Sequence, residues 1–139
     1  MSPRRDARFR VDLRLRDDRG SAVAEFSMVI MLLLALVLAV MQLALALHVR
    51  NTLLDTAAEG ARFAALAGAS DADGVQRTRE LIDTALASSF AQDVSAVRTT
   101  VGGIPVVAVT VRATMPVIGL FGPENALEVT GHAALEVLE

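Results

Sequence analysis

The longest feature of the hydrophobic pattern is an unbroken apolar stretch near the N-terminus. Residues 26–47 carry no formal charge, and only Ser27 and Gln42 interrupt their apolar character. As a helix rising about 1.5 Å per residue, the stretch spans roughly 33 Å, enough to cross a hydrocarbon core of about 30 Å. A buried core helix is a poor alternative, because the stretch is apolar on all sides and the remaining chain is too short to enclose it. The pattern therefore predicts a transmembrane helix, assigned with its flanks to residues 21–48.

Beyond the span, the pattern predicts a small folded domain over residues 49–139. Small apolar residues recur at three- and four-residue steps after the span, so the first helix is expected to continue and to end near Gly68. The polar run 68–74 is expected to form a surface loop. An amphipathic pattern over residues 75–90 predicts a second helix.

After residue 91 the period of the pattern changes to the alternation of β-strands. Residues 94–101, 104–115 and 126–138 are predicted strands, and Gly102-Gly103 is a predicted hairpin turn. In the last strand the odd positions are apolar and the even positions mostly polar, which favours a sheet with one buried face. The predicted fold class is therefore α+β, in which a long N-terminal transmembrane helix continues into a domain with a second helix and a three-stranded antiparallel sheet. Leu120 and Phe121 lie in the predicted loop before the last strand. We expect them either to contact a partner or to fold back on the core.

Charge is distributed unevenly along the chain. Residues 1–20 contain seven Arg and four Asp, whereas residues 21–139 contain six Arg and twelve acidic residues. The positive-inside rule predicts a cytoplasmic basic leader over residues 1–20, one pass through the cell (inner) membrane and an extracytoplasmic domain over residues 49–139. Phe9 is the only aromatic residue of the leader, which lacks the interleaved aromatic residues of a nucleic-acid surface, so no nucleic-acid partner is expected.

Catalytic and metal-binding patterns are not found in the sequence. The chain has 139 residues and no Cys, and its two histidines, His48 and His132, lie far apart. The carboxylates of residues 68–74 lack the spacing of a calcium-binding loop. No nucleotide-binding, hydrolase or metalloprotease motif is present. We therefore expect neither an enzyme, a metal site nor a cofactor.

The junction before the apolar stretch carries the first candidate site. Glu25 and Phe26 stand at the mouth of the span, four residues after the Gly20-Ser21 pair. An ionised Glu at this depth costs free energy unless a cation pairs with it. If the chain were cut after Gly20, the new amino group on Ser21 would lie one helical turn from Glu25, and between neighbouring helices the two charges would set an axial stagger. Alternatively, Gly20 breaks the helix, Ser21 caps it, and Glu25 is stabilised by the helix dipole.

A second motif follows the span, over residues 48–65. It contains Arg50, Asn51, Leu53, Glu59, Gly60, Ala61 and Arg62. Together with Gly20 and the Glu25-Phe26 pair, it resembles the TadE-like family, minor pseudopilins of the tight-adherence (Tad, type IVc) pilus. The apolar stretch departs from many relatives because it has no Pro and carries Gln42 where they have an acidic residue. A kink or a second buried carboxylate is therefore not expected.

This resemblance implies a pilin-like outer domain and a function in pilus assembly, serving adhesion or secretion. A prepilin peptidase would cut between Gly20 and Ser21, and Glu25 and Phe26 would act in subunit assembly. The implied partners are other pseudopilins, major pilin subunits, pilus platform proteins and membrane lipid. Glu59 and its neighbours up to Arg62 form either a subunit contact or a solvated ion pair over a packing stripe.

Two other processing outcomes remain open. The chain could be an uncleaved single-pass membrane protein whose outer domain binds a ligand or partner. The sequence Ala44-Leu45-Ala46 offers a signal-peptidase site, although the apolar stretch is longer than the 7–15 residues typical of a secretory signal.

Overall fold

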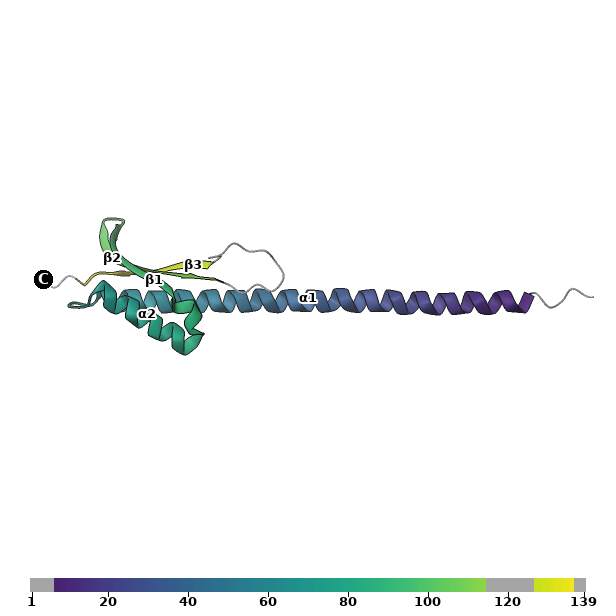
Figure 1. The fold of residues 1–139 in the computed structure, drawn as a ribbon. Helices are drawn as coiled ribbons and strands as arrows, with labels where there is room; N and C mark the ends of the chain where they lie inside the picture. Colours follow the sequence, from purple (N-terminus) through teal and green to yellow (C-terminus); the bar gives the residue numbers. More distant parts are fainter. Residues whose placement is uncertain (1–6, 115–126, 137–139) are drawn as a thin grey trace, which may run out of the picture. The chain divides into compact units, whose positions relative to one another are not determined.

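The computed structural model describes the backbone of residues 7–114 and 127–136, and side chains from residue 20 onward. The elements are α1 (Ala7–Ala65), α2 (Asp71–Ala85), a short 3₁₀ helix η1 (Ser88–Ala91), and the strands β1 (Asp93–Val101), β2 (Ile104–Ala113) and β3 (Leu127–Ala134) (Figure 1). Two helices and an antiparallel sheet confirm the predicted α+β class. The chain divides into two compact units, Met1–Gln42 and Leu43–Glu139, which are described separately.

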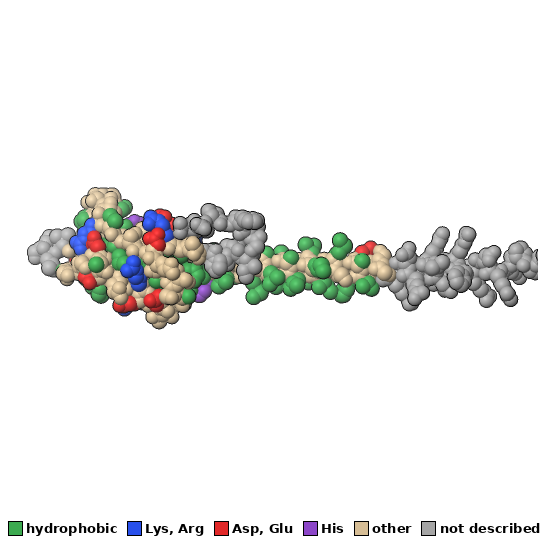
Figure 2. Space-filling model, in the orientation of Figure 1, with side chains coloured by type: hydrophobic (Ala, Val, Ile, Leu, Met, Phe, Trp, Pro, Cys, Tyr) green, Lys and Arg blue, Asp and Glu red, His purple; other side chains and the backbone are tan. Residues whose placement is uncertain are grey.

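The first unit consists of the N-terminal part of α1. From residue 20 to residue 42 every side chain is exposed, and Figure 2 shows apolar side chains along this part of the helix. The stretch Gly20–Ala65 is long and apolar enough to cross a membrane. So much exposed apolar surface is unfavourable in water, and the helix is compatible with a single-pass membrane protein.

The second unit contains a three-stranded sheet in the order β1-β2-β3, with both neighbouring pairs antiparallel. The hairpin between β1 and β2 closes at the pair Val101–Ile104. Gly102 and Gly103 form its turn with φ angles of 59° and 84°. A two-residue turn of this kind needs positive φ at both positions, which glycine adopts without strain. The predicted hairpin is confirmed.

The core of the second unit lies between one face of the sheet and the two helices. Its fully buried residues are Leu53, Ala57, Ala61 and Ala64 of α1, Ile82 and Thr78 of α2, and Val107, Val109 and Val111 of β2. On β3, Val129 is buried whereas Glu128 and His132 are exposed. The expected sheet with one buried and one solvated face is therefore confirmed.

The start of the second helix differs from the prediction. Helix α2 begins at Asp71, so the interpretation of residues 68–74 as a loop holds for residues 68–70 and is wrong for residues 71–74. The Ser70 hydroxyl accepts a hydrogen bond from Asp73 N at 3.2 Å, and the Asp73 carboxylate accepts one from Ser70 N at 2.8 Å. This reciprocal capping box satisfies two backbone donors and starts the helix four residues early.

The other boundaries differ less. Helix α2 ends at Ala85, and η1 follows where the second helix was expected to continue to residue 90. Strand β1 begins one residue early, and β3 covers residues 127–134 of the predicted 126–138. Strand β2 ends at Ala113. Leu120 and Phe121 lie outside the described residues.

Candidate assembly site

Gly20, Ser21 and Glu25 lie on an unbroken part of α1. The Ser21 hydroxyl donates to Glu25 Oε1 at 3.4 Å, one helical turn away. A Cβ built on Gly20 would meet no atom within 4 Å, so this position of the helix surface is not crowded by other side chains. Because the helix runs through these residues, the interpretations of Gly20 as a helix breaker and of Ser21 as an N-cap are wrong.

The Glu25 carboxylate is exposed at the head of the apolar stretch. Phe26 beside it is 66% exposed, and the next polar group, the Ser27 hydroxyl, donates to Val23 O at 2.8 Å and is thereby satisfied. An ionised carboxylate offers about four acceptor sites. In the described part of the chain, the hydrogen-bond partner of the Glu25 carboxylate is the Ser21 hydroxyl. The carboxylate can therefore accept a cationic donor from outside the helix.

The motif after the span divides into exposed and buried positions. Arg50 and Asn51 are exposed, and Arg50 forms no ion pair with any described residue. Leu53 is fully buried in the core of the second unit. The first two residues can therefore contact a partner, whereas Leu53 holds the domain together.

Glu59 and Arg62 form an ion pair over a buried stripe. Arg62 Nη1 lies 3.3 Å from Glu59 Oε2, with the side chains 67% and 49% exposed respectively. Gly60 and Ala61 between them are buried. A Cβ built on Gly60 would lie 1.8 Å from Thr78 Oγ1, so α1 and α2 meet almost backbone to backbone. Of the two interpretations of this segment, the geometry agrees with a solvated ion pair that lies over a stripe of packed small residues.

Two glycines that sequence reasoning did not single out are equally constrained. A Cβ on Gly74 of α2 would lie 2.6 Å from Ala64 Cβ, and one on Gly131 of β3 would lie 2.3 Å from Ala58 N. A glycine inside a strand or helix is the local signal of such close approach. The pattern does not say which element approaches.

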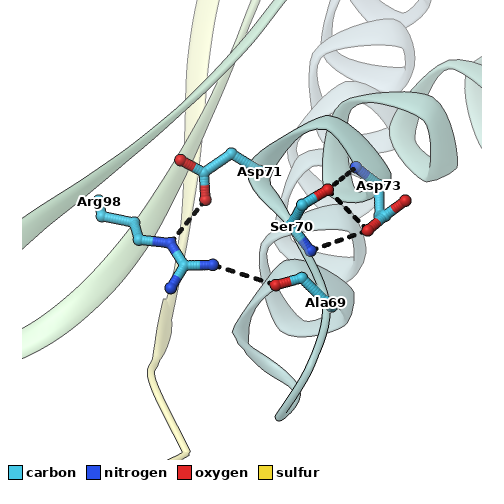
Figure 3. A network of polar contacts seen from close by, with 5 residues as sticks. All are labelled: Ala69, Ser70, Asp71, Asp73 and Arg98. Carbon is cyan, nitrogen blue, oxygen red and sulfur yellow. Dashed lines mark hydrogen bonds and ion pairs between the residues drawn. The ribbon is translucent and has the colours of Figure 1, made fainter.

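The turn between α1 and α2 is tied to the sheet by Arg98 of β1. Its Nε donates to Asp71 Oδ1 at 2.7 Å, and its Nη2 donates to Ala69 O at 3.1 Å (Figure 3). The Ser70 side chain, and then its backbone N–H, hydrogen-bond to the Asp73 carboxylate and hold its pKa below the ordinary value. The capping box is therefore most favourable when Asp73 is ionised.

No three His, Asp or Glu side chains of the described residues converge to hold a metal ion. His132 is exposed on the outer face of β3, and the hydrogen bonds and ion pairs found for the described residues do not involve it.

Comparison with protein families identifies the segment that carries both motifs. Residues 20–62, from Gly20 to Arg62, match the family described as TadE-like protein. The chain thus carries a TadE-like segment over residues 20–62, which confirms the resemblance for this part of the chain. No curated protein and no solved structure matches the chain.

Proposed function

We propose that the chain is a minor pseudopilin that takes part in the assembly of a Tad/Flp-type type IV pilus. The observation that carries this proposal is the Ser21–Glu25 pair, exposed at the head of an apolar helix inside the TadE-like segment. The positive-inside rule supports an N-terminus in the cytoplasm and an outer domain beyond the inner membrane.

Maturation would occur at the Gly20–Ser21 peptide bond. A prepilin peptidase adds water across this amide, which leaves a carboxylate on Gly20 and an amino group on Ser21. Gly20 carries no side chain beside this bond, and the space that a Cβ would fill there is open. Glycine also lowers helix stability by about 1 kcal/mol relative to alanine, which eases the local unwinding that a protease requires.

Assembly would use the charges that cleavage creates. In a bundle of apolar helices, the Ser21 ammonium of one subunit would pair with Glu25 of its neighbour. The low dielectric of the lipid makes an unpaired charge costly and a paired one favourable, so the pair would set the stagger between subunits. Phe26 is exposed beside the carboxylate and would pack against the adjoining helix. Other pseudopilins, major pilins and platform proteins are the proposed neighbours.

The test of maturation is mass spectrometry of the protein isolated from its native host. We expect an N-terminus at Ser21 in the wild-type chain and an intact N-terminus in Gly20→Val, which obstructs the cleavage site. An intact Met1 in fully assembled wild-type material would contradict the proposal and would favour an uncleaved membrane anchor.

The test of assembly compares two exposed carboxylates of the same helix. Glu25→Ala should remain in the membrane but lose most of its co-purification with pilus components. Asp55→Ala removes another exposed carboxylate of α1, in the outer domain, and serves as the matched control. Equal recovery of the two variants with the pilus would show that Glu25 has no pairing role.

A further inference from the structure

Among the described residues, the sheet of the second unit has two free edges, because β1 and β3 each pair with β2 alone there. Leu135 N donates to Pro105 O at 3.0 Å, so Pro105 directs its carbonyl toward the β3 side of β2. Thr100 lies opposite Pro105 on β1. Since Pro105 points away from β1, this is a pair without hydrogen bonds between the two strands. Thr100 therefore directs its own backbone N–H and C=O to the free edge.

The alternation of an antiparallel ladder extends this result along both edges. Every second residue of β1 directs its backbone groups outward, and so does every second residue of β3. These residues are Val94, Ala96, Arg98 and Thr100 on β1, and Glu128, Thr130, His132 and Ala134 on β3. In the ranges 7–114 and 127–136, no backbone hydrogen bond from another element reaches these groups. Each edge is thus open to another strand.

The two edges run in the same direction along α1. Gly131 lies beside Ala57 and Ala58, and Glu136 N donates to Ala65 O at 3.1 Å, so β3 runs in the direction of the helix. Strand β1 is parallel to β3 because both are antiparallel to β2. An antiparallel pair of β1 strands from two copies would set the outer parts of their α1 helices in opposite directions. A parallel pair of β1 with β3 sets these outer parts in the same direction.

Side chains along β1 suit a contact of this kind. Val97 and Val101 are 58% and 55% exposed on the outer face of the sheet, and Ile104 beside them is 58% exposed. On the other edge, an open groove between β3 and the end of α1 is lined by Arg62, Leu66, His132 and Ala134. The groove leaves space beside the outward groups of β3, and β1 brings an edge strand that carries two exposed valines.

We infer that β1 of one copy pairs in parallel with β3 of a second copy, which joins outer domains into a continuous sheet. The contact joins different surfaces, so it leaves a free edge at each end and permits further addition. The inference rests on the common membrane orientation of the proposed function, but it does not require cleavage after Gly20.

Disulfide cross-linking of the full chain in membranes tests this contact, because the chain has no Cys of its own. One tagged chain carries Val97→Cys, and a second, differently tagged chain carries Cys at 130, 132 or 134. Val97 and His132 lie level across the sheet, so the three positions cover a stagger of two residues either way. Within one chain the two strands are about 10 Å apart, too far for a disulfide.

We expect heterodimers from at least one pair, and a ladder of larger species when both substitutions are in one chain. Absence of heterodimers from all three pairs would overturn the inference, and so would preferential Val97→Cys homodimers. Thr100→Pro removes one outward N–H and should weaken the ladder by about three- to tenfold, whereas Thr100→Val keeps the N–H and should not. Cross-links in an uncut Gly20→Val chain would support this contact while leaving maturation to its own test.

Discussion

Gly131 of β3 lies directly against the backbone of Ala58 in α1. A Cβ built on the glycine would be 2.3 Å from Ala58 N and 2.5 Å from Ala58 Cα. These neighbours are backbone atoms of a helix, so a side-chain rotation cannot relieve the overlap. Strand and helix therefore approach more closely than any side chain at residue 131 would permit.

Gly131→Ala should destabilise the outer domain by about 1–3 kcal/mol, because the strand must move away from α1. The measurement is the melting temperature of the full chain in detergent micelles, followed by circular dichroism. Ala134→Val adds more volume to the same strand at an exposed position and should have little effect. Similar melting temperatures for the two variants would contradict the close approach.

Gly60→Ala should destabilise the contact between α1 and α2 by a similar amount, about 1–3 kcal/mol. The added Cβ would collide with Thr78 Oγ1 at 1.8 Å and with Gly74 O at 2.8 Å. Thr78→Ala removes the first of these atoms, so the double variant should lose less stability than the sum of the two single variants. Strict additivity in denaturant unfolding would show that the two positions do not meet.

Arg62→Gln should change the stability of the outer domain by less than about 0.5 kcal/mol. Its ion pair with Glu59 is exposed, and exposed pairs of this spacing contribute little. Unfolding of Arg62→Gln and Glu59→Gln checks this expectation. If either variant folds normally but loses co-purification with the pilus, the pair acts in a subunit contact; a large loss of stability would refute the expectation.

The capping box of α2 should weaken in acid. The pKa of Asp73 is below its ordinary value of 3.8 in the folded chain, so its contribution to stability is complete above that value and is lost as the pH falls through the folded-state pKa. Ser70→Ala removes the hydroxyl whose hydrogen bond is the largest single cause of the lowered pKa. The difference in melting temperature between wild type and Ser70→Ala should therefore shrink below pH 4. A constant difference down to pH 2 would exclude this origin.

The sequence predicts the elements whose signals are local and strong. The uncharged run over residues 26–47 predicts a long apolar helix, and the Gly102-Gly103 pair between alternating strands predicts a hairpin turn. The structure has both the helix and the turn. The start of α2 was missed because Ser70 and Asp73 are polar residues that suit a loop as well as a helix cap. Only the reciprocal hydrogen bonds distinguish the two.

The candidate site was predicted in part. The four-residue spacing of Ser21 and Glu25 places both on one helical face, and their hydrogen bond agrees with it. Cleavage and subunit pairing stay predictions. The contacts of Gly60, Gly74 and Gly131 depend on which elements meet in space, and local periodicity does not contain that information.

The stripe that α1 contributes to the core is built mostly of alanine and glycine. The stripe packs through close approach of its backbone to α2 and β3. The larger buried side chains come chiefly from the sheet. The two elements should therefore respond differently to substitution. In α1, a larger residue in the stripe should lower the stability of the outer domain, whereas in β2 the replacement of a buried valine by a smaller residue should lower it. A more thermostable variant should accordingly be sought by changing the buried side chains of the strands, while the residues of the helical stripe are kept.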